Sequence, residues 1–175
     1  SSDLLELGRM ADSIRKELHP EGLVTFIVDR NINYTNVCIN RCGFCAFYRD
    51  LDSKDAYLLK KSEIFGKIDE TIALGGTQIL LQGGHHPRLK LEWYEDLIRG
   101  IRREFPRLHV HAFSPSEIVH IARVSSVPAA EVVVRLKAAG LHSIPGGGAE
   151  ILVDRVRRVI APGKARTDEW LAVMA

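Results

Sequence analysis

The three cysteines of this chain lie within eight residues of one another, in the stretch NYTNVCINRCGFCAFYRD (residues 33–50). They are Cys38, Cys42 and Cys45, which gives the spacing C-x3-C-x2-C. Thiolates are soft ligands that favour zinc and iron–sulfur clusters. An odd number of cysteines, two of them separated by only two residues, is not typical of a disulfide framework. The triplet therefore predicts a metal centre in a reducing compartment, and we expect a cytoplasmic protein.

Two kinds of metal centre fit three thiolates. A structural zinc site usually has four ligands in two separated pairs, so a fourth ligand would have to come from His85, His86 or His111. An iron–sulfur cluster suits a tight triplet of thiolates, and three cysteines on a four-iron cube leave one iron without a protein ligand. An open metal position is typical of catalytic sites. We favour the cluster, and a non-catalytic zinc- or cluster-binding module stays as the alternative.

The apolar pattern predicts alternating helices and strands around this loop. A helix is expected over residues 1–20, ending near His19. Ser62 and Ser114 are the expected N-caps of two later helices, the second with Pro115 in its first turn. Expected strands cover residues 23–30, 77–84 and 108–114, with 142–148 as a short strand or loop. Further helices are expected over residues 60–76, 90–106, 114–124, 128–141 and 149–162, and one more begins at 167.

Alternating strands and helices indicate an α/β fold with parallel strands and right-handed crossovers. The cysteine loop and most of the other glycine-rich or polar stretches follow the C-terminal ends of the predicted strands, where such folds place active sites. Four strands are too few for a complete barrel, which needs roughly 200–250 residues. We therefore expect residues 1–175 to be a single domain that forms the N-terminal part of a longer (β/α) TIM-type barrel. Without the rest, we expect it to be poorly stable and weakly active.

Composition and charge exclude several function classes. The chain is 46% hydrophobic and 26% charged, which is ordinary for a globular protein. Its net charge of +2 is too small to predict a nucleic-acid partner. No stretch is apolar enough for a signal peptide or a membrane span. The basic clusters at 102–103 and 155–158 are interpreted as solvated helix faces.

The cysteine motif resembles that of the radical S-adenosylmethionine (radical SAM) enzymes. It follows a predicted strand, and an aromatic residue, Phe44, stands just before the last cysteine. The resemblance implies that Cys38, Cys42 and Cys45 bind a 4Fe–4S cluster whose open iron chelates S-adenosylmethionine. An electron from the cluster then cleaves this molecule to a 5′-deoxyadenosyl radical, which removes a hydrogen atom from the substrate. It also implies a one-electron reductant of the flavodoxin or ferredoxin type.

Further site residues follow from the same resemblance. Gly83 and Gly84 match the glycine pair whose backbone meets the methionine amino group, although a plain strand-end turn would also explain them. Ser114 and Glu117 lie where polar contacts to S-adenosylmethionine are found, and they also fit a capping box. The turn at 146–148, followed by Glu150, is expected to open a helix that holds an anionic or ribose group, or to be only a tight turn.

Histidines supply the candidate catalytic groups. His85 and His86 directly follow the glycine pair and could bind substrate or transfer a proton. His109 and His111 alternate along a predicted strand, so both should face the same side. A lone histidine is more often structural than catalytic, and that alternative stays open for each of them.

The resemblance narrows to one group within the superfamily. The stretches LQGGHHPRLKLEWYEDL and HAFSPSEI resemble the group that contains the futalosine-route menaquinone enzymes and the deazaflavin (Fo) synthase subunits. The stretches VDRNINYTNVC and LHSIPGGGAEILVDRVR are most similar to its members that cyclise dehypoxanthine futalosine. This implies a nucleoside-like small-molecule substrate and a role in menaquinone biosynthesis. Aminofutalosine synthase and the tyrosine-using deazaflavin synthase subunit are the alternatives. Members of the group are longer than this chain.

Overall fold

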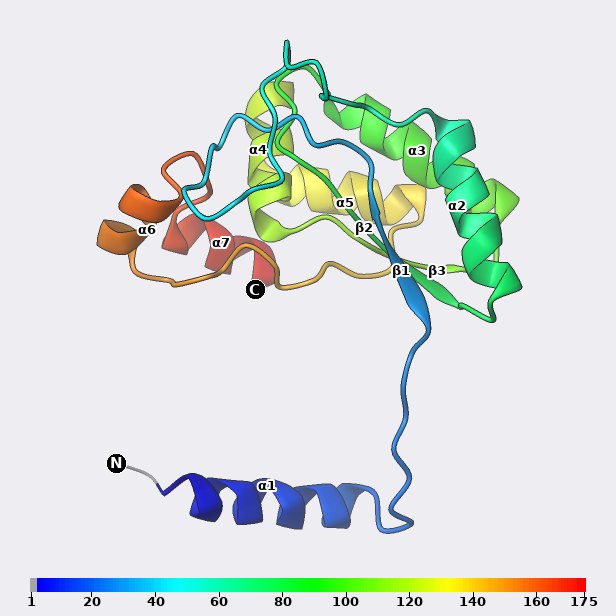
Figure 1. Cartoon of the computed structure of the whole chain (residues 1–175), viewed down its shortest axis with the longest axis vertical. Helices are drawn as coiled ribbons and strands as arrows, with labels where there is room; N and C mark the ends of the chain where they lie inside the picture. The colour runs from blue at the N-terminus through cyan, green and yellow to red at the C-terminus, as the bar shows by residue number, and fades with distance from the viewer. Residues whose placement is uncertain (1–2) are drawn as a thin grey trace.

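The computed structural model describes residues 3–175, and its centre is a parallel sheet (Figure 1). Within these residues the sheet has three strands, β1 (Asp29–Asn33), β2 (Gln78–Gln82) and β3 (His109–Ala112), in the order β1-β2-β3. In the register, Asn33 pairs with Gln82 at the C-terminal end, and Leu81 pairs with Ala112. The predicted α/β class with parallel strands is confirmed.

Helices follow each strand and return the chain to the next one. Ser114 caps α4 by accepting the Glu117 N–H at 3.2 Å, with Pro115 in the first turn as predicted. Gly140 ends α5 with a φ of 111°, a left-handed conformation that glycine adopts without strain. The described residues contain helices α1 (Leu4–Leu18), α2 (Lys61–Ala73), α3 (Leu91–Glu104), α4 (Pro115–Ser125), α5 (Ala129–Ala139), α6 (Asp154–Ile160) and α7 (Thr167–Met174).

The core lies between one face of the sheet and the helices that follow the strands. Side chains alternate between the two faces of a strand, and the apolar ones on the helix side are fully buried: Ile32, Ile79, Leu81, Val110 and Ala112. They pack with buried residues of α2, α3, α4 and α5 in one hydrophobic cluster. Most of the intervening strand residues are polar, and they are exposed or half-buried. One continuous core therefore fixes the strands whose ends carry the site.

The first predicted strand is wrong in its position. The strand begins at Asp29, whereas residues 23–28 form neither helix nor strand. Their apolar side chains are exposed, with 86% of Phe26 accessible to solvent. The apolar run indicated burial, but pairing with β2 selects the more polar stretch that follows it. α1, at the predicted place, has no buried residue and stands apart from the sheet (Figure 1).

Two details of the helices also differ from the predictions. Ser62 lies inside the first turn of α2, and the N-cap is Lys60, whose N–H donates to the Glu63 carboxylate at 2.7 Å. The helix expected over 149–162 covers only Asp154–Ile160. Glu150, with a φ of 43°, is left-handed and cannot belong to a helix. The turn at 146–148 therefore opens no helix.

The expected fourth strand is reduced to a single bridge. Ser143 forms an isolated parallel bridge with His111 beside β3. His109 and His111 face the same side as predicted. His109 Nε2 lies 2.8 Å, and His111 Nδ1 2.7 Å, from the Ser143 hydroxyl oxygen. No helix of residues 3–175 is both long enough and apolar enough to cross a membrane.

Truncating a side chain at the centre of the sheet should show how much the core contributes to the free energy of unfolding. Leu81 is fully buried in β2, so Leu81→Ala should lower the free energy of unfolding by about 2–5 kcal/mol. Val134 on α5 is 65% exposed, and Val134→Ala should change it by less than about 0.5 kcal/mol. Urea titration followed by circular dichroism measures both, and similar losses in the two variants would contradict this account of the core.

Candidate functional site

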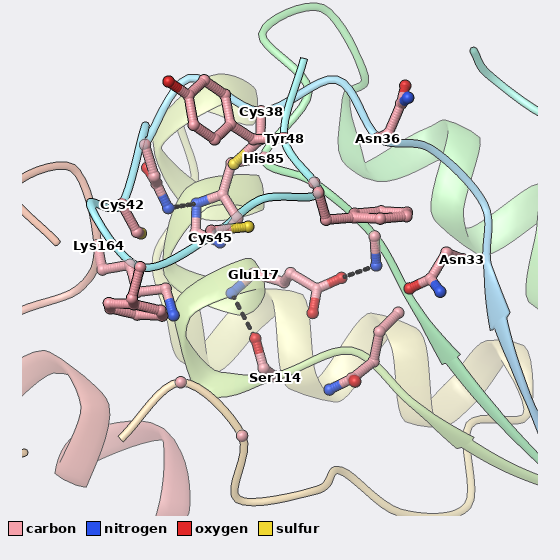
Figure 2. A pocket seen from close by; sticks show the side chains of 18 residues that line it. Asn33, Asn36, Cys38, Cys42, Cys45, Tyr48, His85, Ser114, Glu117 and Lys164 are labelled. Atoms are coloured by element: carbon pink, nitrogen blue, oxygen red, sulfur yellow. Dashed lines mark hydrogen bonds between the residues drawn. The ribbon is translucent and has the colours of Figure 1, made fainter. Parts of the chain in front are cut away.

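A cavity of about 260 Å³ lies at the C-terminal ends of the strands (Figure 2). The structure brings together there most of the residues that the sequence indicated. His86 and Glu150 are not among its lining residues. The predicted residues that line it are Cys38, Cys42, Phe44, Cys45, Gly83, Gly84, His85, Ser114 and Glu117.

The cysteine loop is fixed in place by a backbone hydrogen bond within itself and by backbone hydrogen bonds to two other segments. The Cys38 N–H donates to the Arg49 carbonyl at 3.0 Å, which closes the loop on itself. The Ile39 N–H donates to the carbonyl of His85, beyond β2, at 3.2 Å, and the Gly43 N–H donates to that of Ile160, at the end of α6, at 2.8 Å. The thiols are therefore positioned by the sheet and by α6 together.

The donor set suits an iron–sulfur cluster. Cys38 and Cys45 are half-buried, Cys42 is buried, and all three thiols are free of disulfides. Burial raises the pKa of the Cys42 thiol, and the nearby Lys164 only partly opposes this effect. In the described part of the chain, no three His, Cys, Asp or Glu side chains are arranged around a single metal ion. Thiolates that bind different irons of one cluster need not converge on one point.

The two glycines have a packing reason for their identity. A Cβ atom on Gly83 would lie 2.5 Å from the Tyr34 ring, and one on Gly84 would lie 2.2 Å from the Val37 carbonyl oxygen. The cysteine loop thus passes directly over the end of β2, at a distance that only glycine permits. Within residues 3–175 their carbonyl oxygens accept no hydrogen bond, so the pair can offer acceptors to an amino group in the cavity.

Glu117 is a buried carboxyl group that holds this turn. Its Oε1 accepts the Tyr34 hydroxyl at 2.9 Å and the Gly83 N–H at 3.0 Å. Burial raises the pKa of Glu117 to about 7, although the bonds from Tyr34, Ser114 and Gly83 favour the charged form. Glu117 therefore lies in the first turn of α4, where Ser114 is the N-cap, and its carboxyl group braces the glycine turn and lines the cavity.

His85 belongs to a buried polar network beneath the cysteine loop. Its Nδ1 lies 2.7 Å from the Asn40 amide nitrogen, and its ring packs on that of His120 at 4.8 Å between centroids. His120 in turn contacts the carbonyl of His86 at 2.9 Å. Burial holds the pKa of His85 well below its ordinary value, so its ring is neutral. With Asn40 donating to Nδ1, the remaining proton sits on Nε2.

Glu150 contributes to the site through Lys164. It pairs with Lys164, whose Nζ lies 5.4 Å from the centre of the Phe44 ring and lines the cavity. Buried Arg157 fixes this segment by donating to the carbonyls of residues 148, 149, 151 and 165. Glu150 thus orients a cation and does not hold a ligand at a helix terminus.

Several lining residues were not identified from the sequence. Lys164 follows α6, far along the chain from the cysteines, and no local pattern links it to them. The repeated asparagines after β1 were a usable signal, because polar residues at a strand end point to a site. The lining residues that the sequence analysis missed include Asn33, Asn36, Asn40, Tyr48, Gln82 and Lys164.

The sequence matches the family model of the Radical SAM superfamily over residues 32–175. It is 45% identical over 174 residues to the cyclic dehypoxanthine futalosine synthase of Halalkalibacterium halodurans, covering 99% of this chain and 47% of that protein. It is 47% identical over 168 residues to the 5-amino-6-(D-ribitylamino)uracil–L-tyrosine 4-hydroxyphenyl transferase of a Synechocystis species, covering 93% and 43%. The chain thus spans less than half the length of these relatives.

Solved structures share the fold. The FeFe-hydrogenase maturase HydG superposes with a TM-score of 0.68 at 16% identity, over 99% of this chain and 37% of that one. Methylornithine synthase superposes with a TM-score of 0.50 at 12% identity, over 82% and 51%. These neighbours confirm the predicted partial (β/α) barrel.

A methyl group on Gly84 should push the cysteine loop away from β2. Because the clash is with the backbone carbonyl of Val37, Gly84→Ala should lower the free energy of unfolding by about 1–3 kcal/mol. Gly66, inside α2, has no atom within 4 Å of its Cβ position, so Gly66→Ala should stabilise by up to about 1 kcal/mol. Urea unfolding measures the change in the free energy of unfolding for both variants, and equal changes would refute the packing argument.

The raised pKa of Glu117 should make stability depend on pH. Between pH 4.5, the ordinary pKa, and about 7, the pKa in the folded protein, the folded state keeps a proton that the unfolded state has released. The free energy of unfolding should therefore fall by roughly 3 kcal/mol as pH rises through this window. Glu117→Gln should remove that share of the pH dependence. An unchanged slope in the variant would show that Glu117 titrates normally.

Proposed function

We propose a function from the premise that this chain belongs to the radical SAM superfamily: Cys38, Cys42 and Cys45 bind a 4Fe–4S cluster, and the adjoining cavity binds S-adenosylmethionine. The observation that carries the proposal is the meeting of three free thiols with a glycine turn and a buried acid around one cavity. When bound, the cluster supplies the electron that cleaves S-adenosylmethionine to methionine and a 5′-deoxyadenosyl radical.

The residues around the cavity have distinct roles in this proposal. The free carbonyl oxygens of Gly83 and Gly84 accept hydrogen bonds from the methionine amino group. Glu117 keeps these oxygens in place through its bond to the Gly83 N–H. Ser114 offers a hydroxyl, and Phe44 covers the cavity with an aromatic face that is 54% exposed.

His85 is proposed to bind rather than to take up a proton. Its Nδ1 is engaged by Asn40, which leaves the Nε2–H as a hydrogen-bond donor for a ligand in the cavity. His86, whose Nδ1 accepts the Arg88 N–H at 3.2 Å, does not line the cavity, and its catalytic role stays a prediction without support from the geometry.

For the reaction, we propose the cyclisation of dehypoxanthine futalosine in menaquinone biosynthesis. The 45% identity to a cyclic dehypoxanthine futalosine synthase, over 99% of the chain, supports this choice. A hydrogen atom would pass from the ribose of the substrate to the 5′-deoxyadenosyl radical, which becomes 5′-deoxyadenosine, and the resulting carbon radical would add to the benzoate ring. The adduct would then pass one electron to a one-electron acceptor and release a proton, which gives the cyclic product.

A second candidate function has comparable support. The chain is 47% identical to a 5-amino-6-(D-ribitylamino)uracil–L-tyrosine 4-hydroxyphenyl transferase, so transfer of a tyrosine-derived group is the alternative reaction. Both candidates use a small molecule with a sugar or sugar-alcohol chain. Aminofutalosine synthase chemistry stays a third, untested option.

The proposal predicts a cluster that depends on all three cysteines. After anaerobic reconstitution, the chain should bind about four irons and, with dithionite, release 5′-deoxyadenosine from S-adenosylmethionine. Cys42→Ala should abolish both, whereas Asp52→Ala, an exposed change in the same loop region, should preserve both. Product analysis with each candidate substrate then separates the two reactions. A Cys42→Ala protein that still formed 5′-deoxyadenosine at the parent rate would overturn the assignment.

A further inference from the structure

The cysteine loop reaches the surface beside α6, and both segments carry exposed apolar side chains. Ile39 and Phe44 of the loop are 53% and 54% exposed, and Val159 of α6 is 78% exposed. The bond from Gly43 to Ile160 holds the two segments together, and they lie side by side in Figure 1. We call the surface of residues 39–44 and 153–164 the loop–α6 face.

Positive charge also lies on this face. Residues 150–166 contain five basic and two acidic residues, a net charge of +3, although the whole chain has only +2. Of the five, Arg157 is buried, Lys164 pairs with Glu150, and Arg166 pairs with Asp168. Arg155 and Arg158 are exposed, lie on one side of α6 and form no ion pair within residues 3–175. Arg158 and Lys164 line the same small hollow, and Lys164 also lines the site cavity.

The loop–α6 face is also close to the thiols. The loop segment that carries Ile39 and Gly43 also carries Cys42, and a Cβ on Gly163 would lie 2.7 Å from the Asn40 side chain, so the segment after α6 packs directly on this loop. Electron transfer through protein slows steeply with distance. A carrier that delivers an electron to a cluster on these cysteines therefore gains most by docking on this face.

We propose that the loop–α6 face is the docking surface for an acidic protein that carries single electrons. The proposal rests on the proposed function, because it needs the cluster as electron acceptor. The carrier loses one electron and the cluster gains one, with no bond made or broken. A small apolar centre with a charged rim suits a transient redox encounter, which buries less than about 1,200 Å² and gains its rate from electrostatic steering.

Charge decides among the possible occupants of this face. A second copy of the chain would place Arg155 and Arg158 against the same residues or against a patch of like charge, which is unfavourable in a symmetric contact. An acidic carrier replaces this repulsion with attraction. The two unpaired arginines are therefore the residues whose charge the proposal requires.

The test measures binding and electron transfer separately. Reduced flavodoxin, an acidic one-electron carrier, is titrated against the reconstituted chain, and cluster bleaching is followed after rapid mixing. Arg155→Glu/Arg158→Glu should weaken flavodoxin binding about tenfold and slow cluster reduction similarly. The salt dependence of binding should shrink in the variant. Reduction by dithionite, a small molecule that needs no docking surface, should proceed at the parent rate.

The matched control reverses the charge at two arginine positions outside the loop–α6 face. Arg103 and Arg107 are exposed at the end of α3 and just beyond it, and Arg103→Glu/Arg107→Glu gives the same change in net charge. If both double variants weaken flavodoxin binding equally, only net charge matters and the proposal fails. If neither does, the carrier docks elsewhere and the proposal also fails. A cluster that dithionite reduces but that cleaves no S-adenosylmethionine counts against the proposed function and leaves the docking result intact.

Discussion

The site depends on a backbone contact between the cysteine loop and the end of β2. Gly84 lies so close to the Val37 carbonyl that no side chain fits between them, and its N–H donates to Thr35 at 2.9 Å. The sheet is rigid because its core face is fully buried, so this contact transmits that rigidity to the thiols. A loop that carries three metal ligands would otherwise have to be ordered by the metal itself, at a cost in conformational entropy.

Buried polar groups around this contact are satisfied by one another. Glu117 accepts the Tyr34 hydroxyl and the Gly83 N–H, while His85 and Asn40 bond to each other beneath the loop. Such groups stabilise a unique arrangement only when they are paired, because an unpaired buried polar atom is costly. One such atom in the described residues is Asn40 Oδ1, which faces Gly163 in the segment after α6.

The sequence predicted the parts of the site that obey local rules. The cysteine spacing, the glycine pair and the capping sequence at Ser114 are each recognisable from a few consecutive residues. The residues of all three line the cavity. Lys164 could not be predicted, because its position depends on hydrogen bonds from Arg157 to three carbonyls before α6 and one after it. The strand at 23–30 was misplaced for a related reason: an apolar run predicts burial, but partner strands decide which residues pair. The helix expected from residue 149 does not begin there, because the backbone of Glu150 is left-handed, which the sequence does not reveal.

Two relatives with different reactions are almost equally similar to this chain, at 45% and 47% identity. Residues that a sequence shares with both enzymes cannot be the residues that make their reactions differ. In the proposed function, the thiol loop, the glycine turn and the brace of Glu117 are the parts that serve cofactor binding and radical generation. Choice of substrate needs side chains that differ between the relatives, and the polar, half-buried face of the sheet next to the cavity is where such differences would act. The proposed function therefore assigns this chain a general radical-forming site and assigns selectivity in part to the more than half of each relative's length that the chain does not span.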